Sequence, residues 1–199
     1  MGVCDGRGKE LAFIGRFMQI QTYTRTAVFL HWLIAACVFC QITLGLWMIT
    51  IPKTPIGVRA GWFNVHKSIG ITLGVLILVR VLWRFAHPVP PLPATMPDWE
   101  RTVAKINHLL LYVCMVIMPL SGYLGSSFTK YPILYFGMRL PHWGWDAPAL
   151  KDLFSQIHLA TVIVFIALIA IHIAAALRHL LVVHDAVFQR MWLWRRRAT

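Results

Sequence analysis

The sequence predicts an all-α membrane protein built as a bundle of four transmembrane helices. Of its 199 residues, 58% are hydrophobic and only 13% are charged, whereas a soluble domain carries about 25% charged residues. Four apolar stretches are each long enough to cross a hydrocarbon core about 30 Å thick. The length of the chain favours a single domain, and so much apolar surface excludes disorder over most of it.

The predicted spans are separated by segments that interrupt helices. We place the spans at residues 26–49, 62–85, 103–126 and 153–183. Pro52 and Pro55 follow the first span, and the stiff proline-rich segment 87–93 ends the second, because proline cannot continue a helix. Pro119 predicts a kink in the third span. Residues 128–148 are expected to form an aromatic loop that suits a membrane interface.

The basic residues predict an orientation. The N-terminal segment, the second loop and the C-terminal segment carry more Lys and Arg than the first and third loops. Because cytoplasmic loops are enriched in Lys and Arg, both termini are predicted to be cytoplasmic. We divide the chain into an N-terminal extension, expected to be poorly ordered (1–20), the membrane domain (21–192) and a basic tail (193–199).

The net charge of +12 would suggest a nucleic-acid partner in a soluble protein. Here the Lys and Arg residues lie mainly beside the apolar spans, where topology and anionic lipid account for them. The sequence has no helix-turn-helix or zinc-finger pattern. We therefore expect contact with membrane lipid and no binding of nucleic acid.

Six histidines fall within the predicted spans: His31, His66, His158 and His172, and, nearer the span ends, His108 and His179. Ionisable side chains at such depth are candidates for function, and polar contact between helices is the alternative. His158 and His172 are fourteen residues apart, so at about 100° per residue they share one helix face, separated by roughly 21 Å. In an antiparallel bundle His31 reaches the depth of His172, and His66 reaches that of His158.

Two facing histidine pairs at opposite membrane surfaces suit two metal-porphyrins, each held by imidazole on both sides of the iron. Such iron has no vacant axial position, and its natural chemistry is one-electron transfer. Zinc fits less well, because each pair would need further Cys, Asp or Glu ligands and the spans have almost no carboxylates. The chain lacks Cys-x-x-Cys-His, so the haem would be b-type, bound without a covalent link.

Small residues in the spans allow close approach. Gly70 and Gly74, which follow His66, would let either a macrocycle or a neighbouring helix lie against the backbone. Cys37 and Cys40 form a Cys-x-x-Cys pair inside an apolar helix, where we interpret them as small core residues and not as a redox pair.

The chain resembles the prokaryotic four-helix cytochrome b561 family from about residue 24 to residue 192. The resemblance rests on motifs around the four histidines and on three further segments. They are His31-Trp-Leu, His66-Lys-Ser-Ile-Gly70, Val79-Arg-Val-Leu-Trp-Arg84, Pro88-Val-Pro-Pro91, Asn107-His-Leu-Leu-Leu-Tyr112, His158 and His172-Ile-Ala-Ala-Ala-Leu-Arg-His179. The resemblance implies two b-type haems, an inner one on His31 and His172 and an outer one on His66 and His158.

The resemblance also implies exchange of electrons with a quinone. In a superoxide-oxidising member of the family, superoxide gives up its electron at the outer side and ubiquinone is reduced at the inner side. We therefore expect an oxidoreductase of the bacterial inner membrane with these two substrates. One alternative is a haem b anchor subunit that passes electrons between quinone and a soluble dehydrogenase or hydrogenase partner. A haem-free transporter or metal carrier is another.

Four residues are candidates for the inner side. His108 and His179 are expected near the inner ends of their spans, where they could contact a quinone carbonyl or relay its proton. An interfacial or capping role is the alternative for both. Arg80 and Arg84 are candidates for binding haem propionates or lipid phosphate, because a guanidinium matches either group.

Two residues are candidates for catalysis at the outer side, Lys67 beside His66 and Arg139 in the aromatic loop. The outer loops carry more Lys and Arg than Asp, and a positive field would attract superoxide and raise its rate of association. The alternative is that these cations only solvate the loops.

Overall fold

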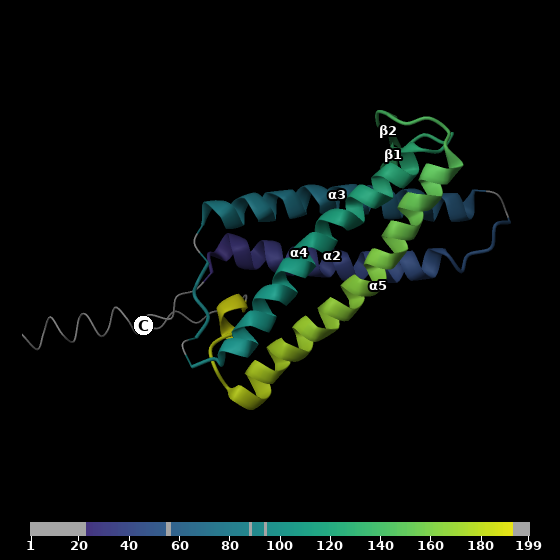
Figure 1. The fold of residues 1–199 in the computed structure, drawn as a ribbon. Coiled ribbons are helices and arrows are strands. Elements are labelled where there is room, and N and C mark those ends of the chain that lie inside the picture. Colours follow the sequence, from purple (N-terminus) through teal and green to yellow (C-terminus); the bar gives the residue numbers. More distant parts are fainter. Residues whose placement is uncertain (1–22, 55–56, 88, 94, 193–199) are drawn as a thin grey trace, which may run out of the picture.

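The computed structural model describes residues 23–54, 57–87, 89–93 and 95–192, and it is mostly helical (Figure 1). Four of its helices are long and apolar enough to cross a membrane. They are α2 (Arg25–Met48), α3 (Val58–Ala86), α4 (Asp98–Ser127) and α5 (Pro148–Arg178). Two short elements follow, the π-helix η1 (His179–Val183) and the 3-10 helix η2 (Gln189–Met191). The four predicted spans are thereby confirmed, while the extension 1–20 and the tail 193–199 lie outside the described residues.

Local chemistry explains where the helices begin. The Thr24 hydroxyl accepts a hydrogen bond from the Ala27 amide at 3.2 Å and caps α2. Asp98 and Glu100 stand in the first turn of α4, where carboxylates oppose the positive end of the helix dipole. Pro148 occupies the first turn of α5, a position that requires no backbone donor.

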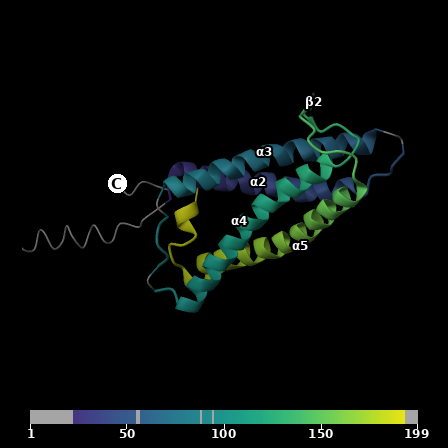
Figure 2. The same cartoon turned by 45° about the horizontal axis from the view of Figure 1, so that its top comes forward.

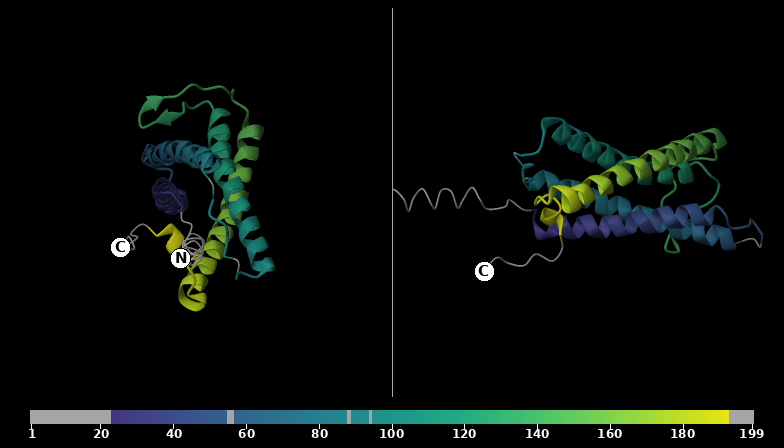
Figure 3. Two further views of the ribbon diagram at one scale, coloured as in Figure 1. Left: turned by 90° about the vertical axis from the view of Figure 1, so that its left-hand side faces the viewer. Right: turned by 90° about the horizontal axis from the view of Figure 1, so that it is seen from below.

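The helices form two crossed pairs. α2 packs along α3, α4 packs along α5, and α3 contacts α4 between the pairs. Figures 1 and 2 show α4 and α5 running obliquely across α2 and α3. The start of α2 and the last described residues lie at the same end, which we call the terminal end (Figure 3). There the Trp32 indole donates to the Met191 carbonyl at 2.7 Å.

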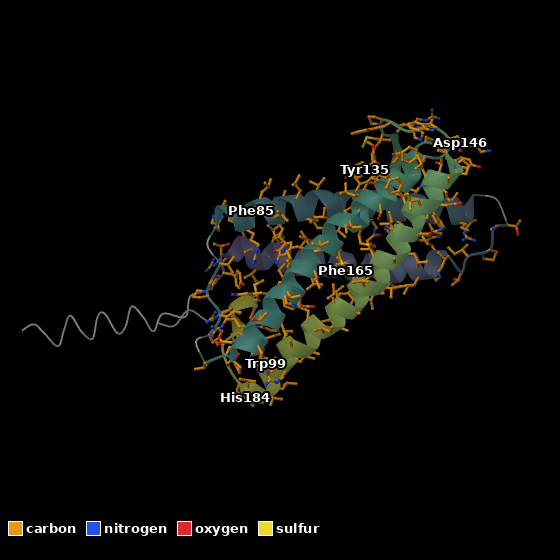
Figure 4. The ribbon with its side chains drawn as sticks, viewed as in Figure 1. Phe85, Trp99, Tyr135, Asp146, Phe165 and His184 are labelled. Atoms are coloured by element: carbon orange, nitrogen blue, oxygen red, sulfur yellow. The ribbon has the colours of Figure 1, made fainter. Side chains whose placement is uncertain are left out.

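The centre of the bundle is apolar. Figure 4 shows Phe165 of α5 at mid-length, between Asp146 at one end and His184 at the other. The buried cluster around it consists of Ile34, Val38, Leu73, Ile77, Cys114, Phe165 and Leu168. Many other large apolar side chains point outward, as expected where lipid replaces water as the solvent. Cys37 packs against this cluster, as expected of a core residue, whereas Cys40 is exposed, so its interpretation as a core residue is wrong.

The aromatic loop contains a feature that the sequence analysis missed. Two short antiparallel strands, β1 (Leu134–Tyr135) and β2 (Met138–Arg139), form a hairpin. Its two turn residues, Phe136 and Gly137, both have positive φ, at 47° and 90°, as a type I′ turn requires. The predicted all-α fold therefore needs this small correction. We call the end of the bundle that carries these strands the hairpin end.

The hairpin rests on α3 through one buried hydroxyl. The Phe136 amide donates to Ser68 Oγ at 2.9 Å, and the Ser68 hydroxyl lies 3.3 Å from the Leu134 carbonyl. Thr72, one turn further along α3, meets the Tyr135 hydroxyl at 3.1 Å. These contacts hold the loop over the end of α3 that carries His66.

Candidate functional site

Helix α5 presents two histidines to two different neighbours. Near the terminal end, the rings of His172 and His31 of α2 have centroids 6.2 Å apart and planes inclined by 72°. Near the hairpin end, the rings of His158 and His66 of α3 are 6.4 Å apart and inclined by 75°. The structure thus brings together both pairs of histidines that the sequence analysis singled out.

The ring spacing fits a shared metal. An imidazole nitrogen binds a first-row metal at about 2.0–2.1 Å, and the ring centre lies about 1.2 Å beyond it, so two rings on opposite sides of one ion are about 6.4 Å apart. The spacings of 6.2 and 6.4 Å agree with this value. Among the described residues no group of three or more His, Cys, Asp or Glu is placed to hold a metal ion. Paired imidazoles without further ligands suit iron whose other positions are filled by a macrocycle.

His158 is oriented for metal binding. Its Nδ1 lies 3.1 Å from the carbonyl oxygen of Met118 and 3.1 Å from the hydroxyl of Ser121. A carbonyl only accepts hydrogen bonds, so Nδ1 carries the ring proton and donates it. The lone pair of Nε2 is then free for a metal, which is the usual arrangement of metal-binding histidines.

Two glycines make room for the rings of the hairpin-end pair. A Cβ atom on Gly45 would lie 3.2 Å from Cε1 of His66, and one on Gly122 would lie 3.4 Å from Cε1 of His158. Neither glycine could be found from the sequence, because their partners are on other helices. Of the two glycines predicted to allow close approach, Gly74 packs against a helix: a Cβ atom on it would lie 3.2 Å from Cβ of Pro119 in α4.

A cavity of about 490 Å³ adjoins the hairpin-end pair, within the range of sites for organic cofactors. Its walls are mainly apolar, and His66 and His158 both line it. Lys67 and Lys151 add two cationic side chains. Arg139 lies apart, exposed on β2. The structure therefore places Lys67 at this cavity and Arg139 on the outer surface of the hairpin.

Arg80 contacts the terminal-end pair directly. Its Nη2 lies 3.4 Å from Nδ1 of His31, and its Nη1 donates to the Ala27 carbonyl at 3.2 Å. Arg84 is one turn away, with its guanidinium 5.3 Å from the centre of the Tyr112 ring. Both arginines line a cavity of only about 30 Å³, which is the volume of about one water molecule.

His108 lies beside the terminal-end pair. It is ten residues after Asp98, where α4 begins, and its ring lies 5.2 Å from the ring of His172. Its Nδ1 is 2.6 Å from the Ala104 carbonyl, so Nδ1 donates and Nε2 is left for another partner. His108 is therefore a third imidazole beside the terminal-end pair.

His179 is held in a polar cluster that the sequence analysis missed. It is the first residue of η1, and its side chain is 8% exposed. Its Nδ1 lies 2.7 Å from Asp185 Oδ2, and its Nε2 lies 3.5 Å from Glu100 Oε1. Glu100 also forms an ion pair with Arg178. Glu100 and Asp185 could have been singled out from the sequence only because acidic residues are rare, with 7 Asp and Glu in the chain.

Comparison with known proteins decides the family. The family model described as prokaryotic cytochrome b561 matches residues 22–194. The chain belongs to the prokaryotic cytochrome b561 family. It is therefore a membrane electron-transfer protein of a family that binds b-type haem, and the two spaced histidine pairs fit that cofactor.

Three curated relatives of this cytochrome b561 cover most of its length. Cytochrome b561 homolog 2 of Escherichia coli (strain K12) is 36% identical over 167 residues, 81% of this chain and 86% of the relative. Cytochrome b561 homolog 1 of the same organism is 24% identical over 172 residues, 85% and 96% of the two chains. Probable superoxide oxidase CybB of Yersinia pestis is 28% identical over 132 residues, 64% and 72%.

Proposed function

We propose that this cytochrome b561 holds two b-type haems, on His31 with His172 and on His66 with His158, and that it oxidises superoxide and reduces ubiquinone. The observation that carries the proposal is the spacing of the two ring pairs, 6.2 and 6.4 Å. Haem held by these two pairs of histidines would supply reversible one-electron transfer. The substrates are proposed by analogy with the relative named probable superoxide oxidase.

The overall reaction requires electrons, protons and two separated sites. Two superoxide ions give up one electron each and become dioxygen, and one ubiquinone takes up these two electrons with two protons to become ubiquinol. Superoxide is a small anion in water, whereas ubiquinone is an apolar molecule in lipid. The chain must therefore attract an anion at one end and supply protons at the other.

The hairpin end supplies the attraction in this proposal. Lys67 and Lys151 line the cavity next to His66 and His158, and Arg139 adds positive charge on the exposed hairpin. The Lys151 ammonium is 2.8 Å from Asp152, which offsets part of its charge. Lys67 is therefore assigned to guide the anion, because a cationic cleft raises the local concentration of small anions.

The terminal end supplies the proton donors. His108 lies beside His172, and its Nδ1 faces the Ala104 carbonyl, so Nε2 accepts a hydrogen bond from a quinol hydroxyl when the ring is neutral and donates one to a quinone carbonyl when the ring is protonated. His179 touches Asp185 on one side and Glu100 on the other, so it can exchange protons with carboxylates that are 20% and 16% exposed. Arg80 is assigned to a haem propionate, and Arg84 to a propionate or a lipid phosphate, because a guanidinium pairs with either group.

The membrane orientation follows from the same assignment. We place the hairpin end at the outer surface of a bacterial inner membrane and the terminal end at the cytoplasm, in agreement with the Lys and Arg distribution. Both ends of the described chain lie at the terminal end (Figure 3). Protons for the quinone would then come from the cytoplasm.

The test is an optical spectrum of the purified, detergent-solubilised protein with haem quantitation, followed by pulses of superoxide with and without ubiquinone. We expect two haems per chain. Their spectrum should change to that of reduced haem when superoxide is added and return to that of oxidised haem when ubiquinone is added. A preparation without a Soret band would refute the haem assignment. Two haems that superoxide fails to reduce, together with a co-purifying soluble dehydrogenase or hydrogenase, would instead identify an anchor subunit.

A further inference from the structure

Gln41 is a polar side chain in the middle of α2, and its amide contacts the segment that carries His66. Gln41 Nε2 donates a hydrogen bond of 2.9 Å to the backbone carbonyl of His66. Because that carbonyl can only accept, the amide nitrogen must face it and Oε1 must point the other way. Oε1 is buried without a hydrogen-bond partner, and Gln41 lines the cavity at the hairpin end.

His66 has a matching unpaired atom. Its Nδ1 is also buried without a partner, whereas Nδ1 of His158 across the pair meets the Met118 carbonyl. A histidine that binds metal through one nitrogen normally donates the other N–H to an oxygen. Two unpaired atoms therefore lie at this cavity. Oε1 of Gln41 is an acceptor without a donor, and Nδ1 of His66 needs an acceptor for its proton.

Two glycines allow this approach. A Cβ atom on Gly70 would lie 3.2 Å from Nε2 of Gln41, and one on Gly45 would lie 3.2 Å from Cε1 of His66. Gly45 is one helical turn beyond Gln41, on the same side of α2. A Cβ atom at 45 or 70 would crowd the ring of His66 or the amide of Gln41, so these two glycines leave room for both side chains.

We propose that Gln41 is a positioning residue for His66 as a ligand of the hairpin-end haem. Its amide N–H holds the backbone of His66 against α2, and its Oε1 accepts the proton of His66 Nδ1 through one bridging water molecule. Such a hydrogen bond makes the imidazole a more basic ligand, which favours the oxidised iron and lowers its midpoint potential. The inference rests on the proposed function in requiring a haem on His66.

The test compares Gln41→Leu, Gln41→Glu and Thr43→Val in the purified, haem-loaded protein. Leucine keeps the size of Gln41 and removes both hydrogen-bonding groups, while a neutral glutamic acid keeps one donor and one acceptor. Thr43 is exposed two residues further along α2 and is not among the residues that line the cavity, so Thr43→Val serves as the matched control. The readouts are haem per chain, a redox titration that resolves the two haems, and the low-spin ferric EPR signals.

We expect Gln41→Leu to raise the midpoint potential of one haem by about 59 mV, which is a tenfold change in a one-electron equilibrium. Its EPR signal should shift, the other haem should be unchanged, and Gln41→Glu and Thr43→Val should match the wild type. Loss of one haem only, in Gln41→Leu alone, would also support the inference. Should Gln41→Leu fail to accumulate, Gln41→Met, which also lacks both hydrogen-bonding groups, takes its place with the same expected shift and the same outcomes against the inference.

Unchanged potentials and EPR signals in Gln41→Leu, with both haems retained, would overturn the inference and leave the proposed function intact. An equal shift of both haems would do the same, because a general change of packing does not single out His66. A wild-type protein that binds no haem would overturn the proposed function itself, which separates the two failures.

Discussion

The carbonyl oxygen of Met118 accepts a hydrogen bond from Nδ1 of His158 over 3.1 Å. Met118 belongs to α4, which carries none of the four paired histidines. A helix that supplies no proposed haem ligand therefore orients a ligand on the neighbouring helix α5. The Ser121 hydroxyl, less than one turn further along α4, reaches the same nitrogen. α4 thus determines which ring nitrogen of His158 faces the cavity, and its packing against α5 becomes part of the site.

Gly122→Val should displace His158. A Cβ atom at this position lies 3.4 Å from Cε1 of His158, so alanine should be tolerated, whereas the branched valine would overpack the contact at a cost of about 1–3 kcal/mol. We expect Gly122→Val to lose the hairpin-end haem and to keep the other, measured as haem per purified chain. Gly61→Val is the control, since a Cβ atom there meets nothing within 4 Å. Two haems retained in Gly122→Val would contradict the assignment.

His172→Ala should remove the terminal-end haem alone. The apolar spans and the other three paired histidines remain, so the variant should still insert in the membrane and bind one haem per chain. The measurement is haem content by pyridine haemochrome, with the spectrum of the remaining haem. His142→Ala, at an exposed loop position, should keep two haems. A His172→Ala protein with two full equivalents would show that His172 is not a ligand.

Salt should slow superoxide oxidation. Exposed charges are screened over about 10 Å at 0.1 M ionic strength, so an attraction for the anion must weaken as salt is added. Lys67→Gln should lower the rate at low salt several-fold and reduce its salt dependence, whereas Lys105→Gln, exposed on α4, should not. The measurement is the initial rate of haem reduction by superoxide between about 10 mM and 1 M salt. A wild-type rate that is indifferent to salt would argue against guidance by Lys67.

Glu100→Gln should affect quinone reduction more than superoxide oxidation. Glu100 joins Arg178 to His179, and its loss leaves His179 with Asp185 alone. We expect slower reoxidation of the haems by ubiquinone, an unchanged rate of their reduction by superoxide, and a loss of stability of about 1 kcal/mol or less. Asp98→Asn is the control, because that carboxylate is 95% exposed and pairs with Arg101 in the same turn. Equal slowing of both half-reactions would argue against a role at the quinone site.

Much of the fold could be predicted from the chain, because membrane spans follow from local hydropathy. The four spans agree with α2 to α5, and the prolines near residues 52 and 90 fall in the connections between helices. The structure adds five residues to the start of α4 and of α5, since polar first turns lie outside an apolar window. The hairpin escaped prediction because strands of two residues carry no periodic signal, although Gly137 marks its turn.

The candidate site could likewise be predicted only in part. The two pairs on α5 could be anticipated, because fourteen residues nearly complete four helical turns and the antiparallel topology sets the depths. The surroundings of the rings could not, since Gln41, Gly45 and Gly122 meet their histidines across helix interfaces. His108 and His179 were named as candidates, yet their partners were unknown until α4 was placed against α5.

By itself the sequence determined that this protein is a four-span membrane bundle with histidines at two depths, because hydropathy and helical period are properties of the chain alone. Only the tertiary structure decided which atoms face those histidines. Gln41 reaches the carbonyl of His66, and Met118 reaches the ring of His158, because α2 lies along α3 and α4 along α5. Helix crossing and rotation arise from packing between distant segments, and no local pattern encodes them.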